Sequence, residues 1–436
     1  MAEDRIRIVT VTQKRHPRAG YRFGHTVEPG HWRSRLGAAV PQARNPPLAQ
    51  DQSPIYLDNA ATTPLCAAAA EALDKVGREA FGNASSIHSF GKEPKKLLQD
   101  AREFLRGTLH AAQIVLTSGG TEADQLGVLG AAMARPRGRV LCGAADHPAI
   151  LMQRELLGRL GYELMTVATT QDGDLHPETL FEAMGKDVRV VSILHGHNEL
   201  GTLANVQELV EVVRRTAPDA HVHVDLVQSY GKVPFDIDEL DVDSVAVAGH
   251  KLHAPRGIGF LALSSTAQVK PILLGGGQEE GMRGGTENVA GAVALARAAE
   301  VAFSHLHASA QHMEALAERM LDQIAAAFPD VERLGNPERH LPHVLSLRIP
   351  AIVAHTLLLR CDSQGLAFST GAACPGDHQS ENHVHKAIRL TKQESRETMR
   401  FSFSRATTAA EVDRAASIVV AEAHALRDLA PAQSVR

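Results

Sequence analysis

The sequence predicts an α/β domain with a mainly parallel sheet, followed by a smaller α+β domain, and three observations support this. Apolar strand-like runs alternate with helical segments from about residue 55 to 265, as in chains that build parallel sheets. Helical sequence from about Asn288 to Phe328 then predicts a long connector into a second domain. Beyond it, the expected strands are VLSLRI, GLAFST and MRFSFS, and the expected last helix is AEVDRAASIVVAEAHALRDL.

Length and composition fit a globular protein of two domains. The chain has 436 residues, of which 44% are hydrophobic and 22% charged. The net charge of -5 gives no indication of a nucleic-acid partner or of an acidic membrane surface. No apolar run approaches the roughly 20 residues that a membrane span requires, so we expect no membrane segment.

The cysteine and histidine spacings argue against a disulfide framework and a metal site. The four cysteines form no CxxC pair, which favours a reducing, cytoplasmic location. Two histidine groups have no HExxH or CxxC companion. The cysteines are Cys66, Cys142, Cys361 and Cys374, and the histidine groups are His305, His307 and His312, and His378, His383 and His385.

Residues 1–53 differ from the rest of the chain, with nine Lys or Arg against four acidic residues. They lack the apolar core of a secretory signal, and we expect a poorly ordered basic extension. An organellar transit peptide stays open as an alternative, despite the acidic start MAED. We expect a large domain at 66–300 and a small domain formed by 54–65 and 301–432.

The first globular segments alternate strand and helix. A short strand and a turn are expected in YLDNAATTPL, and CAAAAEALDKVGREAF has apolar residues at helical spacing. The loop GNASSIH precedes KEPKKLLQDAREFLRGTL, which is typical of an amphipathic helix.

The strand VAVA ends in a sequence that contains a lysine. The stretch VAVAGHKLHAPRGIGF places His250 and Lys251 in a turn between two apolar strands. Burial reduces an amine's preference for the protonated form, so a lysine there can attack an aldehyde. An ordinary loop lysine is the alternative for this stretch alone.

Other strands also end in polar residues, where ligands of open α/β sheets collect. The segment QIVLTSGGTEAD leads through Gly120 and Thr121 into a helix whose free amides suit a phosphate. Singly, each polar residue could be a loop histidine, a turn former or a helix cap. Together they supply what pyridoxal phosphate needs, whereas GxGxxG and P-loop motifs are missing. The residues that follow the strands are His147, Asn198, Asp225, Gln228, His250 and Lys251.

Ten motifs, in order, resemble the cysteine desulfurase and selenocysteine lyase family of fold-type I pyridoxal-phosphate enzymes, which are class-V aminotransferase-like. The resemblance covers about residues 55–430. It implies a transferase fold with a seven-stranded-type sheet, and a homodimer. The motifs are LDNAATTPL, GNASSIH, TSGGTEAD, DHP, HNELGT, VDLVQSYGK, GHKLHAPRGIGF, GGGQEEGMRGGTEN, STGAAC and RFSFSR.

The resemblance implies roles around the cofactor ring. Lys251 would carry pyridoxal phosphate covalently. His147 would stack on the ring and shuttle protons. Asp225 would pair with the ring nitrogen, and Asn198 and Gln228 would bond its phenolic oxygen.

The resemblance also implies residues for the phosphate. Gly120, Thr121 and His250 would hold it in one subunit. Thr286 would join them from the neighbouring subunit of the dimer.

For the substrate, the resemblance implies that Arg400 and Asn59 bind L-cysteine, and the Arg400 fork suits a carboxylate. Cys374 follows GLAFSTGAA and precedes a polar stretch, and as a thiolate it would take the sulfur as a persulfide. The products would be L-alanine and sulfur for an acceptor protein, as in iron–sulfur cluster assembly.

Two alternatives stay open. A selenocysteine lyase, releasing selenium and alanine from L-selenocysteine, is suggested by Asp377 and His378 after GAAC, whereas Pro148 looks more like the desulfurases. A non-catalytic scaffold of the same fold is the other alternative, but it would have no need to keep this whole set of reactive residues.

Five positions depart from the family pattern. Ala248 stands where a phosphate-binding serine is common, so one hydrogen bond to the cofactor would be missing and retention would weaken. His197, Leu226 and Glu280 replace Asn, a small residue and Arg, respectively. Pro375 stiffens the segment after Cys374.

Overall fold

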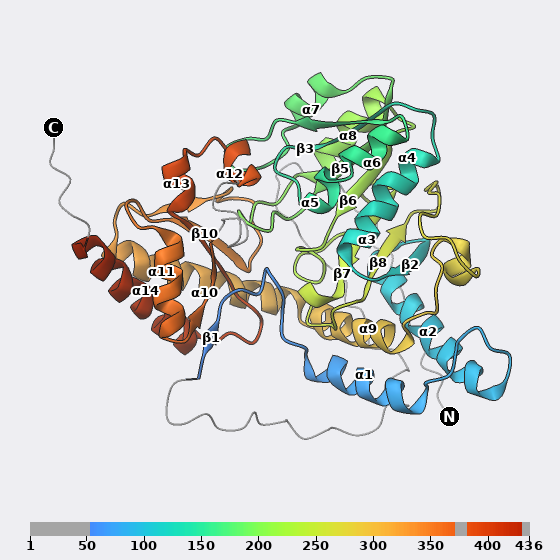
Figure 1. Ribbon diagram of the computed structural model, residues 1–436, viewed down its shortest axis with the longest axis horizontal. Coiled ribbons are helices and arrows are strands. Elements are labelled where there is room, and N and C mark those ends of the chain that lie inside the picture. Colours follow the sequence, from blue (N-terminus) through green and yellow to red (C-terminus); the bar gives the residue numbers. More distant parts are fainter. Residues whose placement is uncertain (1–52, 371–381, 430–436) are drawn as a thin grey trace, which may run out of the picture.

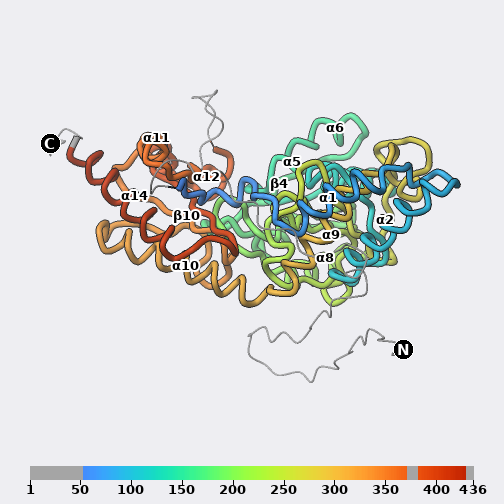
Figure 2. Tube along the Cα trace, turned by 90° about the horizontal axis from the view of Figure 1, so that it is seen from below, coloured from blue at the N-terminus to red at the C-terminus, as the bar shows by residue number. Residues whose placement is uncertain are grey.

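The computed structural model describes residues 53–370 and 382–429 and shows two domains side by side along its long axis (Figures 1 and 2). The large domain contains a seven-stranded sheet in the order β2-β8-β7-β6-β5-β3-β4. Every neighbouring pair is parallel except those that involve β8, so the predicted mainly parallel seven-stranded sheet is confirmed. The strands are β2 (Gln113–Thr117), β3 (Arg139–Gly143), β4 (Glu163–Val167), β5 (Val188–Leu194), β6 (His221–Asp225), β7 (Ser244–Ala248) and β8 (Gly259–Leu263).

Helices cover both faces of this sheet (Figure 1). Every residue of β6, β7 and β8 is buried, which explains the nearly continuous apolar sequences of β7 and β8. A π-helical turn, Leu126–Gly130 (η2), joins α3 to α4. The helices are α1 (Ala67–Glu79), α2 (Ser89–Gly107), α3 (Gly120–Gln125), α4 (Ala131–Met133), α5 (Pro148–Leu151), α6 (Arg154–Arg159), α7 (Pro177–Ala183), α8 (Val206–Thr216) and α9 (Val289–Ser304).

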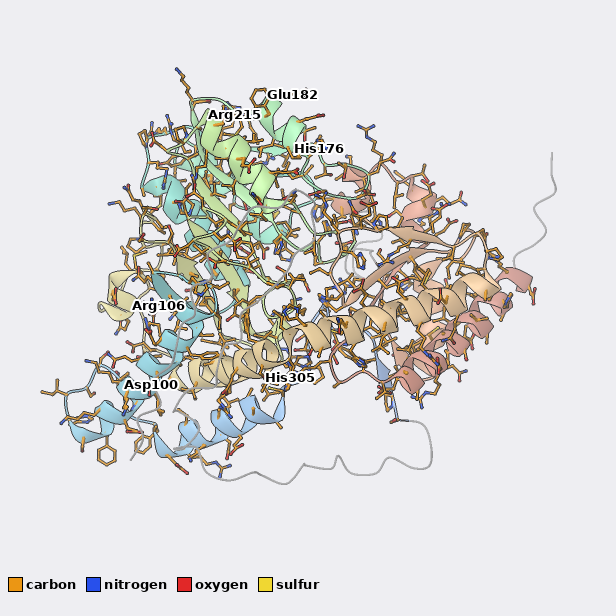
Figure 3. The ribbon with its side chains drawn as sticks, turned by 180° about the vertical axis from the view of Figure 1, so that it is seen from behind. Asp100, Arg106, His176, Glu182, Arg215 and His305 are labelled. Atoms are coloured by element: carbon orange, nitrogen blue, oxygen red, sulfur yellow. The ribbon has the colours of Figure 1, made fainter. Side chains whose placement is uncertain are left out.

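The helical connector expected from about Asn288 to Phe328 is present as two helices. The segment forms α9 and α10 (Leu306–Ala327), bent by 75° at a break where His305 has non-helical backbone angles (Figure 3). The apolar residues of α9 belong to the large-domain core, whereas those of α10 belong to the small-domain core. The chain turns there because its two halves pack on different cores. No single described helix is long and apolar enough to cross a membrane; only the bent pair passes that test together.

The small domain is built on an antiparallel sheet in the order β12-β13-β10-β9, and β1 pairs with β11 in parallel. Its core combines Ile55 and Leu57 with apolar residues from Met313 to Ala423. This cluster is separate from the large-domain one. The domain boundaries themselves stay a prediction. Its elements are β1 (Ile55–Tyr56), β9 (Glu332–Leu334), β10 (Val344–Arg348), α11 (Ala354–Ser363), β11 (Leu366–Ala367), β12 (Ser369–Thr370), α12 (His383–Ala387), α13 (Lys392–Arg396), β13 (Thr398–Ser402) and α14 (Ala409–Leu429).

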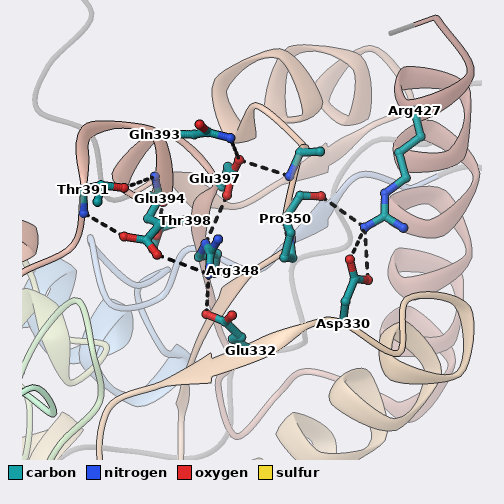
Figure 4. Close-up of polar contacts among 11 residues, drawn as sticks. Asp330, Glu332, Arg348, Pro350, Thr391, Gln393, Glu394, Glu397, Thr398 and Arg427 are labelled. Atoms are coloured by element: carbon teal, nitrogen blue, oxygen red, sulfur yellow. Dashed lines mark hydrogen bonds and ion pairs between the residues drawn. The ribbon is translucent and has the colours of Figure 1, made fainter. Parts of the chain in front are cut away.

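Charged side chains fasten α13 and the sheet of the small domain (Figure 4). The buried Glu397 carboxylate accepts hydrogen bonds from Arg348 Nε and from the Ala351 amide, both at 3.0 Å. Arg348 also pairs with Glu332 on β9 at 2.6 Å. These contacts stiffen the start of β13, the strand that carries Arg400.

Candidate active site

Four of the predicted residues lie at the carboxyl ends of neighbouring parallel strands, the edge where α/β sheets bind ligands. His147 follows β3 and caps α5, and Asn198 follows β5. Asp225 is the last residue of β6. Lys251 ends the 3-10 turn Gly249–Lys251 directly after β7.

The Lys251 amine is held by backbone carbonyls. Its Nζ donates to the oxygens of Ala60 at 2.5 Å and Ala61 at 2.7 Å. Burial, followed by the nearby Arg400 guanidinium, lowers the pKa of Lys251 to about 8, against the opposing effects of two carboxylates. The amine is therefore much closer to its neutral, nucleophilic form than an exposed lysine is.

The loop that holds Lys251 also holds its neighbours. Gln228 Nε2 donates to the same Ala60 oxygen at 2.9 Å. The Thr63 amide and hydroxyl both donate to the His250 carbonyl, and His250 Nδ1 lies 3.2 Å from Thr62 Oγ1. This loop follows β1, so the small domain helps to position residues at the end of β7.

Asp225 is a buried carboxyl, 3% exposed, whose Oδ1 accepts the Val227 amide at 2.8 Å. Burial and then the Asp124 carboxyl raise its pKa to about 8. A cation placed against Asp225 would stabilise its ionised form, so the site suits a ring nitrogen that carries a proton.

The start of α3 lies close to the ends of β6 and β7. A Cβ atom on Gly120 would meet Val227 Cγ2 at 2.7 Å and Ala248 Cβ at 3.3 Å, so only glycine fits this approach. Thr121, the next residue, is exposed. Free amides at a helix start next to a threonine hydroxyl can hold a phosphate.

Arg400 on β13 points from the small domain towards the same edge. Its Nη1 donates to the Asn198 carbonyl at 2.8 Å, and its Nη2 pairs with Asp58 at 2.6 Å. The residue is 8% exposed, and its buried Nε has no hydrogen-bond partner. A buried guanidinium with an unused donor suits a substrate carboxylate.

His147 is fixed by its own helix. Its Nδ1 accepts the Ala149 amide at 3.1 Å as the N-cap of α5, so a neutral ring carries its proton on Nε2. The residue as a whole is partly accessible to solvent. Partial burial of the ring, followed by the charges of Lys251 and His383, lowers the pKa of His147 to about 4. The ring is neutral at physiological pH.

Three predicted site residues remain, of which Asn59 lines a small cavity against Lys251. Thr286 is exposed in the loop before α9, and no hydrogen bond between described residues joins it to the site. The Asn59 amide donates to the carbonyls of Tyr56 and Ser402, so only its Oδ1 is left for a substrate. Cys374 lies outside the described residues. The roles of all three stay predictions.

Sequence reasoning missed several residues of the site. Asp58 pairs with Arg400, and the buried His343 lies 3.3 Å from Gln228 Oε1 through its Nε2. Buried Lys232 donates to the Gln228 carbonyl at 2.8 Å. The motif LDNAATTPL could have indicated Asp58, because it immediately precedes Asn59. No motif in the sequence around His343 predicts that this residue lies at the site.

The departures from the family pattern have local explanations. His197 Nε2 lies 3.1 Å from the Ala145 carbonyl and its Nδ1 accepts the Glu199 amide, so it braces the loop after β5. Leu226 is fully buried in the large-domain core. Glu280 accepts a hydrogen bond from Gln113 at 2.9 Å.

A small cavity of about 20 Å³ lies against Lys251, between the two domains, and is lined also by Asn59, Lys232 and Arg405. A larger one of about 280 Å³ lies between α1, α2 and α9 and includes none of the predicted site residues. Among residues 53–370 and 382–429, no group of three histidine, cysteine or acidic side chains could hold a metal ion.

Comparisons with known proteins agree with this geometry. The family model described as "Aminotransferase class-V" matches residues 55–415. A curated relative, "Cysteine desulfurase NifS" of Azotobacter vinelandii, is 35% identical over 383 residues, which cover 86% of this chain and 94% of that protein. "Cysteine desulfurase IscS" of Dictyoglomus turgidum is 32% identical and covers 86% of this chain and 96% of that protein.

Solved structures show the same architecture. A structure titled "NIFS-LIKE PROTEIN" superimposes with a TM-score of 0.79 at 29% identity, covering 84% of this chain and 98% of the other. Another, titled "SspA in complex with cysteine", has a TM-score of 0.70 at 26% identity and covers 81% of this chain and 100% of the other.

Proposed function

The chain belongs to the aminotransferase class-V family, and we propose that it is a pyridoxal-phosphate-dependent cysteine desulfurase that converts L-cysteine to L-alanine. The observation that carries the assignment is the position of Lys251 at the end of β7, with Asp225 and Arg400 close enough to shift its pKa. A nucleophilic amine, a buried carboxyl and a carboxylate-binding guanidinium thus meet at one edge of the sheet.

The residues present fit the cofactor. Lys251 would bind it covalently, Asp225 would face its ring nitrogen, and the start of α3 with Thr121 and His250 would hold its phosphate. When bound, pyridoxal phosphate supplies an electron sink for the charge left by removal of a substrate proton. Ala248 offers no hydroxyl to the phosphate.

The protein's own groups then bind the substrate and move its protons. Arg400 holds the L-cysteine carboxylate, using the donor that has no partner in the protein. Lys251, with its pKa lowered to about 8, accepts and returns a proton near neutral pH. Neutral His147 presents the proton on its Nε2.

The sulfur is transferred to Cys374 in this proposal. The Cβ–Sγ bond of L-cysteine breaks, and a bond forms between that sulfur and Cys374 Sγ. The substrate thiol proton ends on Cβ, so alanine and an enzyme persulfide are formed without an external oxidant or reductant. A sulfur-acceptor protein, with a role in iron–sulfur cluster assembly, then takes the persulfide sulfur.

The test is to incubate the purified protein with L-cysteine and a thiol reductant, and to measure alanine and sulfide. Equal amounts of both from the wild type, and neither from Cys374→Ala, would support the proposal. Alanine from L-selenocysteine but not from L-cysteine would instead indicate a selenocysteine lyase. Alanine from neither substrate would contradict the assignment.

A further inference from the structure

A buried polar stripe runs along β6 towards Asp225. Because strand side chains alternate, His221, His223 and Asp225 share one face of β6, and each is at most 3% exposed. Strands covered on both faces are normally apolar. The proposed chemistry uses Asp225 but assigns nothing to the two histidines.

One side chain of the stripe is bonded to the helix above it. Asp124, three residues after Thr121 on α3, places its Oδ1 3.2 Å from His223 Nε2. Asp124 is 1% exposed and His223 is fully buried. On its other side, His223 Nδ1 lies 2.8 Å from Ser244 Oγ on β7.

Glycines bring the helical segment close to the strand on both sides of this contact. A Cβ on Gly127 would lie 2.3 Å from His223 Nδ1. One on Gly120 would lie 2.7 Å from the side chain of Val227, just beyond Asp225. Asp124 therefore bonds to β6 between two places of tight packing, where a small displacement of the helix would cause a clash or break the bond.

The contact joins two uncharged groups. Burial raises the pKa of Asp124 to about 8 and lowers the pKa of His223 to about 4. At neutral pH the carboxyl is mostly protonated and the ring is neutral, so an amide in place of the carboxyl can keep the hydrogen bond.

We propose that Asp124 and His223 are positioning residues that fix the phosphate-binding start of α3 relative to Asp225, so that both ends of the cofactor bind as one unit. Thr121, at the helix start, precedes Asp124 by three residues, less than one turn, and Asp225 follows His223 by two residues. This inference rests on the proposed function, because it concerns the same cofactor.

The test compares pyridoxal phosphate with pyridoxal, which lacks the phosphate, as ligands of the full chain after cofactor removal. Equilibrium dissociation constants are measured for the wild type, Asp124→Ala, Asp124→Asn and Ser192→Ala. Ser192 is the matched control, because it is buried beside His223 on β5 and its hydroxyl has no hydrogen-bond partner.

Asp124→Ala is expected to weaken pyridoxal phosphate binding about tenfold, as the loss of one buried hydrogen bond allows. The affinity for pyridoxal should change less than about twofold. Pyridoxal has no phosphate, so its binding does not depend on the distance between the start of α3 and Asp225. Asp124→Asn should restore the affinity, and Ser192→Ala should not alter it. If Asp124→Ala does not fold, Asp124→Ser, whose side chain is too short to reach His223, serves the same comparison.

Equal losses for the two ligands would overturn the inference, since they would indicate a general loosening of the site. An unchanged affinity of Asp124→Ala for pyridoxal phosphate would also overturn it. A wild-type protein that binds neither ligand would instead contradict the proposed function, so the two failures are distinct.

Discussion

Lys251 and Gln228 share one acceptor, the carbonyl oxygen of Ala60, at 2.5 Å from Nζ and 2.9 Å from Nε2. Ala60 lies in the loop that follows β1, a strand packed in the small domain. The orientation of the Lys251 amine thus depends on how the two domains sit against each other.

Arg400→Lys should raise the KM for L-cysteine about tenfold, because losing a charged hydrogen bond to the substrate costs about 1.5 kcal/mol or more. The kcat should change much less if the interaction holds substrate and transition state equally. Steady-state alanine production measures both constants. Arg319→Lys, on α10, is the control: its guanidinium pairs with Asp413 at an exposed surface, so the change should leave KM unaltered. An unchanged KM in Arg400→Lys would exclude Arg400 as the carboxylate site.

His147→Gln should lower kcat about a hundredfold or more, as the loss of a positioned proton donor or acceptor does. The chain offers a close control in His176, which also precedes a proline and caps its helix, α7, with its Nδ1 (Figure 3). His176→Gln removes the same kind of cap and should leave kcat unchanged. Similar activity losses in both variants would mean that His147 matters for helix stability alone.

Ala248→Ser should tighten the binding of pyridoxal phosphate. Ala248 Cβ approaches the turn at Gly120, so a hydroxyl there would face the proposed phosphate position. A hydrogen bond to a charged acceptor is worth about 1.5 to 3 kcal/mol, which corresponds to at least about a tenfold gain in affinity. Cofactor titration of the two proteins tests this, with pyridoxal as the ligand that should show no gain. A gain for pyridoxal as well would exclude the phosphate as its cause.

The contribution of the buried Asp225 carboxyl to the stability of the cofactor-free protein should fall as the pH rises from about 4 to about 8. The pKa of Asp225 is raised from 3.8 to about 8 by burial, so the folded state holds a proton that the unfolded state has released in this window. The stabilisation is present below pH 4 and is lost as the pH passes through 8. In urea unfolding across this range, the free energy of unfolding of the wild type should fall relative to that of Asp225→Asn as the pH rises. A difference between the two proteins that stays constant with pH would contradict the burial argument.

The sequence predicted the large-domain sheet because its strands carry strong local signals. The buried strands β7 and β8 are short apolar runs, and β6 alternates valine with polar residues and ends in Asp225. The carboxyl ends of parallel strands meet at one edge, so Asp225 and Lys251 could be placed together before any coordinates existed. The resemblance then supplied their roles.

Contacts between distant segments could not be predicted in this way. The pairing of Asp58 with Arg400 joins residues 342 positions apart, and its geometry follows from strand pairing in the small domain. The break at His305 carries no proline or glycine signal; it reflects the packing of α9 and α10 on two different cores. The Asp124–His223 hydrogen bond also depends on tertiary packing. The two residues are 99 positions apart, and no local sequence pattern predicts that they are in contact.

The most direct test is the visible absorption of the protein after reconstitution with pyridoxal phosphate, together with alanine formation from L-cysteine. The wild type should show the band of a lysine-bound cofactor and produce alanine. Lys251→Ala should lose both, whereas Lys186→Ala, at an exposed position, should keep both. A band and activity that persist in Lys251→Ala would contradict the assignment of Lys251 as the cofactor-binding residue.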